Sequence, residues 1–97
     1  MTFYERALAA TARVTRVSRR QIVGRRRNMP YVEARRLLIL TLWHRYTDQM
    51  IADYMKRSRV TIFLTRRGAI EYMLMSRTFA NKYERILKIL GIDEEQV

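Results

Sequence analysis

Arginine is the residue type through which this sequence is best equipped to bind another molecule. Seventeen of its 20 basic residues are arginine, nine residues are acidic, and the formal net charge is +11. A guanidinium group forms paired hydrogen bonds with phosphate or guanine, whereas the ammonium group of lysine acts as a point charge. So high a charge opposes compaction of the free chain, and a polyanion would relieve it. The composition therefore predicts a polyanionic partner.

Hydroxyl groups and arginines lie close together in the second half of the chain. Thr61 and Thr65 are four residues apart, so on a helix they share one slim, polar face. Such a face fits the major groove of DNA, where hydroxyl groups can contact base edges or phosphates. Arg59 lies in the first turn, where recognition helices touch bases, and Arg66 and Arg67 flank the face and suit phosphates.

Catalytic and metal chemistry find little support in the sequence. There is no cysteine, and His44 is the single histidine, so neither a thiolate zinc site nor a Ser-His-Asp triad is expected. The acidic residues stand singly except in the C-terminal tail, which gives no pair of catalytic carboxylates. We expect a binding protein and not an enzyme, with no catalytic residue, metal or cofactor, and with His44 in a structural or surface role.

Helices must position these residues. One proline and three glycines predict long helices with short connections, and no strand-like alternation is present. We expect residues 1–97 to form one all-α domain, a compact bundle of five to six helices with a frayed acidic tail over 91–97. The expected helices cover about residues 2–13, 18–23, 30–46, 47–55, 58–75 and 78–90.

Capping residues mark most of the expected helix boundaries. Thr2 and Glu5 have the spacing of a capping box, and Ser18 is the expected cap of the second helix. Gly24 ends that helix, and Pro30 suits the first turn of the third, which is the expected central helix.

Apolar spacing predicts the buried faces. In the fifth helix, Phe63, Ile70 and Leu74 are expected to point at the core, and Trp43 is expected to be a core residue. The two helices on either side of Lys56–Ser58, residues 47–75 in all, have the pattern of a helix-turn-helix, in which the second helix enters the major groove.

Several stretches have the spacing of a known DNA-binding domain. They are Val17–Gly24, the basic stretch Arg25–Arg27, the later Val32–Arg36 that opens the long helix, and Thr47–Ala52. Together, roughly 57 of 97 residues, from position 14 to position 70, resemble the C-terminal domain of the bacterial chromosomal replication initiator DnaA, in the Trp-repressor-like helical group. There is no Gly-rich phosphate loop, so the resemblance does not extend to an ATPase domain.

This resemblance implies that the protein binds two adjacent grooves of one DNA duplex. It also implies a role in replication or transcription control. The helix 58–75 would lie in the major groove, and Arg25–Arg27 would reach the adjacent A·T-rich minor groove. Arg27 is the expected inserted side chain, and Thr61 falls on a threonine that the family uses for base contact. The loop and the start of the helix must then lie on the same side of the bundle.

The expected DNA contacts also include Arg35, which would clamp a phosphate, and Arg57 and Ser58 of the turn between the two helices. The full set is Arg25, Arg26, Arg27, Arg35, Arg57, Ser58, Arg59, Thr61, Thr65, Arg66 and Arg67. The family signature Arg-Asp-His-Thr-Thr-Val matches Ser58–Phe63, and Arg59 and Val60 replace its acidic residue and its histidine. We therefore expect the protein to recognise another sequence or to bind more loosely. It would be a free-standing relative of the initiator, carried by a phage or mobile element, or a trimmed piece of a larger protein. The initial Met favours a whole small protein.

Two other functions stay open. An RNA-binding or ribosome-associated protein would need exposed aromatic rings, and most rings here fall on expected core stripes. An adaptor or a homodimer would use an apolar strip made of Tyr72, Met75, Phe79 and Tyr83. The longest apolar run, Leu37–Trp43, is far shorter than the ~20 residues of a membrane span. We therefore expect no membrane partner and a cytoplasmic, nucleoid-associated location.

Overall fold

The computed structural model describes residues 1–92 and is all-helical over that part of the chain, as expected. Its six helices are α1 (Phe3–Thr15), α2 (Arg19–Val23), α3 (Met29–Leu42), α4 (Asp48–Met55), α5 (Arg59–Met75) and α6 (Arg77–Leu90). Residues 93–97, which hold the acidic part of the expected tail, lie outside the described residues. None of the helices in residues 1–92 has the length and apolar character needed to cross a membrane.

Serine and threonine caps explain why most helices begin where they do. In five of the six, the cap side chain accepts a hydrogen bond from the backbone N–H three residues further on, which satisfies one of the unpaired donors of the first turn. The caps are Thr2, Ser18, Thr47, Ser58 and Ser76. At α3 the cap residue Asn28 makes no such bond, and Pro30 lies in the first turn instead.

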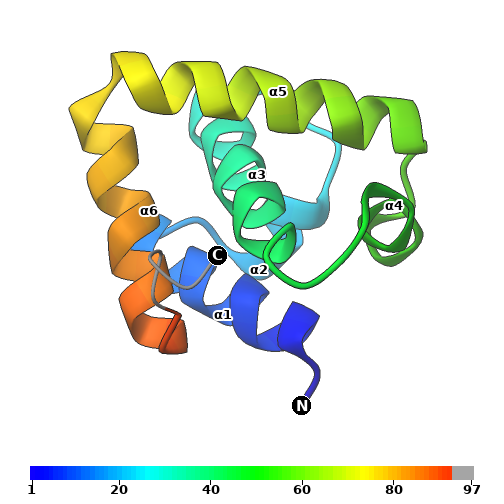
Figure 1. Ribbon diagram of the computed structural model, residues 1–97, viewed down its shortest axis with the longest axis horizontal. Helices are drawn as coiled ribbons and strands as arrows, with labels where there is room; N and C mark the ends of the chain where they lie inside the picture. Colours follow the sequence, from blue (N-terminus) through cyan, green and yellow to red (C-terminus); the bar gives the residue numbers. More distant parts are fainter. Residues whose placement is uncertain (93–97) are drawn as a thin grey trace.

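Helix α3 runs through the middle of the molecule and carries much of the core. Figure 1 shows α5 crossing above it and α1 lying below it, with α6 and α4 on opposite sides. Helix α3 contacts α1, α2, α5 and α6. Leu37, Leu38 and Leu42 are fully buried, and burying each such side chain contributes about 1.5–3 kcal/mol. The expected central helix is therefore confirmed.

The C-terminal end of α3 differs from the expectation. The helix ends at Leu42 and not near Tyr46, so Trp43 lies just beyond it and is 48% exposed. The prediction of a core tryptophan is wrong because the residues before it already fill the space between the helices. Further along, Arg45 and Tyr46 pack on the start of α1: both contact the Phe3 ring, and the Tyr46 hydroxyl accepts a hydrogen bond from the Tyr4 backbone N–H at 3.2 Å.

The inward face of α5 is also different from the expected one. Ile62 and Ala69, two turns apart, are its fully buried residues, whereas Phe63 and Leu74 are exposed and Ile70 is half-buried. Helix α5 crosses the bundle at its edge, so only a narrow stripe of it touches the core (Figure 1). The core residue at the start of α5 is therefore Ile62 and not Phe63.

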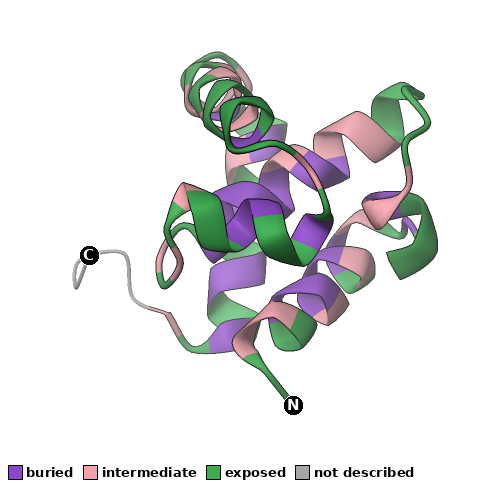
Figure 2. Ribbon diagram, turned by 90° about the vertical axis from the view of Figure 1, so that its right-hand side faces the viewer, coloured by how far each residue is buried: buried purple, intermediate pink, exposed green. Residues whose placement is uncertain are grey.

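Helix α6 buries the face that its spacing predicts. Its buried residues are Phe79, Tyr83, Ile86, Leu87 and Leu90, and Figure 2 shows how buried and exposed positions divide between the faces of the helices. Two residues of the expected partner strip, Phe79 and Tyr83, are thus core residues, because α6 needs them to pack against the bundle. Tyr72 is half-buried with its ring 4.9 Å from that of Phe79, and Met75 is exposed.

Two further details concern α6 and its end. His44 is half-buried and forms a hydrogen bond with the Tyr83 hydroxyl, which agrees with its expected structural role. Gly91 has a φ of 72°, and the Ile92 backbone N–H donates to the Leu87 carbonyl at 2.9 Å, which closes the helix. Residues 91 and 92 are therefore attached to the bundle and not frayed.

Candidate nucleic-acid interface

Helices α4 and α5 are joined by the three-residue turn Lys56–Ser58. Lys56 has a left-handed backbone conformation with a φ of 56°, and the Arg57 backbone N–H donates to the Ala52 carbonyl at 3.0 Å. The Ser58 hydroxyl then caps α5 by accepting from the Thr61 backbone N–H at 3.1 Å. This turn places the first residues of α5 at the edge of the molecule, as Figure 1 shows.

Two arginine side chains tie this turn to the basic loop that follows α2. The Arg57 guanidinium donates through Nη2 to the Gly24 carbonyl, and the Arg25 guanidinium donates through Nη2 to the Lys56 carbonyl at 3.2 Å. These contacts join segments more than 30 residues apart in the sequence. The expectation that the basic loop and the start of α5 lie on the same side of the bundle is therefore confirmed.

A cavity of about 560 Å³ lies between the loop and α5. Its walls carry four guanidinium groups and three hydroxyl groups but no carboxylate, and they come from Arg25, Arg27, Val32, Arg35, Arg57, Ser58, Thr61 and Thr65. Seven of the eleven expected contact residues are in this set. A second cavity of about 500 Å³ lies between α2 and the loop, and its lining includes Arg25, Arg26 and Tyr31.

In the main cavity, Arg57 lies close enough to Arg25 and Arg35 for their charges to repel one another. Burial lowers the pKa of Arg57, and the nearby charge of Arg25 lowers it further. Burial also lowers the pKa of Arg35, with Arg57 as the second cause. The Arg57 Nη1 atom is buried without a hydrogen-bond partner. Neither ion pair found within residues 1–92 involves these side chains, so an anion in the cavity would relieve their repulsion.

Arg35 differs from its expected role as a phosphate clamp. Its side chain is buried, and it donates through Nε to the Ile22 carbonyl at 2.7 Å and through Nη2 to the Gln21 carbonyl at 3.2 Å. These bonds satisfy carbonyls at the C-terminal end of the short helix α2. Arg35 therefore fixes the end of α2 and the loop that follows it, because the last four carbonyl groups of a helix have no partner within the helix.

Arg66 is also committed inside the protein. It forms a two-bond ion pair with Asp48 at 3.0 and 2.8 Å, and its guanidinium lies 4.2 Å from the centre of the Trp43 ring. The expectation of a phosphate contact by Arg66 is thus corrected. Arg59 and Arg67 are exposed and form no ion pair within the described part of the chain, so both can reach a ligand.

The hydroxyl face lies where it was expected. Thr61 is exposed, and its hydroxyl oxygen accepts a hydrogen bond from the Ser58 hydroxyl at 2.8 Å, so its own proton can be donated outward. Thr65 is half-buried in the cavity wall. At Gly68, two turns beyond Thr61, an added β-carbon would meet nothing within 4 Å.

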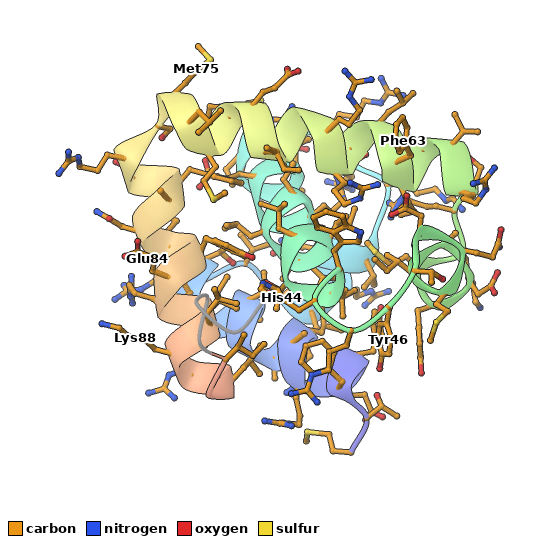
Figure 3. The ribbon with its side chains drawn as sticks, viewed as in Figure 1. His44, Tyr46, Phe63, Met75, Glu84 and Lys88 are labelled. Atoms are coloured by element: carbon orange, nitrogen blue, oxygen red, sulfur yellow. The ribbon has the colours of Figure 1, made fainter. Side chains whose placement is uncertain are left out.

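Two apolar residues on the outside of α5 were missed by the sequence reasoning. Val60 and Leu64 are 61% and 59% exposed. The apolar spacing does not reveal them because it predicts Phe63 as the inward residue. With Ile62 inward, positions two residues before and two after it point away from the core. Figure 3 shows the side chains along α5, with Phe63 labelled near the start of the helix.

Comparison with protein-family models, with curated proteins and with solved structures finds no match to this chain. The resemblance to the initiator domain therefore stays an expectation from the sequence. No group of three or more His, Cys, Asp or Glu residues within residues 1–92 is arranged to hold a metal ion. The arrangement of arginines and hydroxyl groups is suited to non-covalent binding of a phosphate-bearing ligand.

Proposed function

We propose that this chain is a double-stranded-DNA-binding module and not an enzyme. In this proposal α4, the turn Lys56–Ser58 and α5 act as a helix-turn-helix, and α5 enters the major groove. The loop Arg25–Arg27 reaches the adjacent minor groove, with Arg27 as the inserted side chain. The protein would act in replication or transcription control, as the resemblance to the initiator domain implies, and would associate with the nucleoid.

The observation that carries the proposal is the cavity between the basic loop and α5. Arginines from three separate segments, the basic loop, α3 and the α4–α5 turn, converge there with the hydroxyl groups of Ser58 and Thr61, and no carboxylate balances them. A strand of DNA that passes from the major to the minor groove would place a phosphate at this point. Phosphate contacts of this kind fix the register of a protein on the duplex, while base contacts give specificity.

The proposal assigns different effects to different side chains. Thr61→Ala and Arg59→Ala should each cost about 1–3 kcal/mol on the preferred sequence and relax the sequence preference. Arg26→Ala should weaken binding to all duplexes alike. Arg27→Ala should abolish a preference for A·T pairs in the flank of the site, because that preference depends on the shape and potential of the minor groove.

The test begins with selection of preferred sequences from randomised duplexes and continues with fluorescence anisotropy on the selected site. For Arg27, flanks of A·T, G·C and inosine·C pairs are compared, since inosine lacks the minor-groove amino group of guanine. Arg85→Ala is the matched control, because it removes the same charge from an exposed position on α6. The proposal fails if no duplex binds at low salt, or if Arg85→Ala weakens binding as much as Arg27→Ala.

The RNA-binding alternative is less well supported because several surface rings already pack on other side chains: Trp43 and Phe63 contact arginines of α5, and a tyrosine cluster packs on itself. The Tyr54 ring stacks on Tyr4 at 4.7 Å and on Tyr46 at 5.2 Å. Readers of single-stranded RNA use such ring faces for bases. Competition between duplex DNA and structured RNA for the labelled protein separates the two functions.

A further inference from the structure

The outward edge of α5 combines two exposed apolar side chains with an open position. Val60 and Leu64 are four residues apart, so they lie side by side on the helix surface. Gly68 continues the same edge one turn further along, with nothing within 4 Å of where its β-carbon would be. Burial of Ile62 and Ala69 on the opposite side fixes the rotation of α5, so this edge faces away from the protein.

The surroundings of this edge indicate what covers it. Thr61 and the arginine cavity border it on one side, and the exposed Arg67 borders it on the other. The covering surface is therefore anionic at its margins and offers a few small apolar groups at its centre. The DNA major groove fits this description, because phosphates line both sides and the 5-methyl group of thymine is the apolar group exposed on its floor.

We infer that Val60 and Leu64 are specificity-determining residues that contact the 5-methyl groups of thymines. The inference rests on the proposed function, since it assumes that α5 lies in the major groove. β-Carbons four residues apart on a helix are about 5–6 Å apart. The bases of one strand are about 3.4 Å apart along the axis. The two side chains therefore reach thymines on adjacent or next-adjacent base pairs, and the preferred site contains such a pair.

The experiment replaces each thymine of the selected site by deoxyuridine, one at a time. This change removes only the methyl group and leaves base pairing and the hydrogen-bonding groups unchanged. Loss of one buried methyl contact corresponds to about a four-fold weaker Kd. We expect this loss at two thymines and little change at the others, measured by anisotropy at fixed salt.

Protein variants show which side chain contacts each of the two thymines. Val60→Thr keeps the shape of the side chain and replaces a methyl group by a hydroxyl group, and Leu64→Gln keeps a side chain that favours a helix. At the thymine that the replaced side chain contacts, each variant should bind the thymine and deoxyuridine duplexes with equal Kd. At the other thymine, the same variant should retain the four-fold difference in Kd. Leu74→Gln is the control, because Leu74 is still more exposed, at 83%, but lies at the far end of α5. It should leave both differences intact.

The outcomes separate this inference from the proposed function. Binding to a selected duplex with no sensitivity to deoxyuridine overturns the inference and leaves DNA binding in place. Sensitivity that persists in both Val60→Thr and Leu64→Gln also overturns it, because other residues then read the methyl groups. Failure to bind any duplex overturns the proposed function itself. All variants change exposed positions, so unchanged circular dichroism melts establish that folding is not the cause.

Discussion

Neighbouring arginines on α5 have different surroundings. Arg66 is held between the Trp43 ring and the Asp48 carboxylate, and the side chains of that ion pair are only 11% and 16% exposed. Arg67, the next residue, points into solvent near the Phe63 ring. The same side-chain chemistry therefore serves folding at one position and is available for binding at the other.

This difference predicts separable effects of two substitutions. Arg66→Ala should lower the free energy of unfolding by about 2 kcal/mol, because it removes two hydrogen bonds between charged groups and leaves Asp48 poorly solvated. Arg67→Ala should change stability by less than about 0.5 kcal/mol and should weaken duplex binding. Urea unfolding and anisotropy measure the two quantities. Equal loss of stability in both variants would contradict this assignment.

At the residue scale, the role of a site residue could be predicted from the sequence only where its side chain bonds to residues nearby in the sequence or to no other residue. Thr61 was placed correctly because its cap, Ser58, is three residues away. Arg35 and Arg66 were misassigned because their partners are the α2 carbonyl groups and Asp48, from 13 to 18 residues away. Nothing in the local sequence distinguishes an arginine that folds back onto the protein from one that reaches outward.

At the scale of the elements, the starts of the helices were predictable, but the end of α3 and one buried face were not. Caps such as Ser18 and Ser58 are local signals, so they mark where α2 and α5 begin. The face of α6 was also predictable, since its apolar residues share one side. Helix α5 carries apolar residues all around its surface, so its spacing fits more than one rotation, and packing on α3 decides between them.

Helix α5 also contains a glycine that the fold does not require. Gly68 lies in the interior of a 17-residue helix, and a β-carbon there would meet no neighbour. Glycine costs a helix interior about 0.8–1.0 kcal/mol relative to alanine. Because glycine lets another chain approach the backbone closely, we attribute its presence to the ligand side of the helix.

Replacement of this glycine should therefore have opposite effects on stability and binding. Gly68→Ala should raise the free energy of unfolding by about 1 kcal/mol and weaken duplex binding. Thermal melts and anisotropy on the same samples measure both effects. Gly91→Ala is the contrasting variant: it should destabilise the protein, because Gly91 has a φ of 72°, which alanine adopts at a cost of about 1–2 kcal/mol. Full DNA affinity in Gly68→Ala would show that the duplex does not approach this part of α5.

At the scale of the whole molecule, charge works against folding. A formal charge of +11 is carried on a body whose extents are 29 × 26 × 24 Å. Within residues 1–92 only two basic side chains, Arg66 and Lys82, form ion pairs, with Asp48 and Glu33. The Debye length is about 10 Å at 0.1 M salt, so basic groups on one face repel one another at low salt. Folding against this repulsion depends on the apolar core around α3.

Salt should therefore affect folding and DNA binding in opposite directions. Raising NaCl from 50 to 500 mM screens the repulsion, so the Tm of the free protein should rise by several degrees, since 1 kcal/mol corresponds to about 4–8 °C for a domain of this size. Duplex affinity should fall, with a log–log slope on the order of −5 if about six phosphates are engaged.

Duplex DNA should stabilise the folded protein at low salt, as added NaCl does for the free protein. At 50 mM NaCl, duplex at 100 times its Kd should stabilise the protein by about 2.7 kcal/mol. At the same duplex concentration, this gain should shrink as salt rises and the affinity falls.

Arg26→Ala should reduce the log–log slope of affinity against salt by about one. Arg85→Ala should leave this slope unchanged, although it removes the same amount of overall charge. A Tm that falls with added NaCl would contradict the role of self-repulsion. Equal slopes for wild type and Arg26→Ala would show that the basic loop does not contact the phosphates.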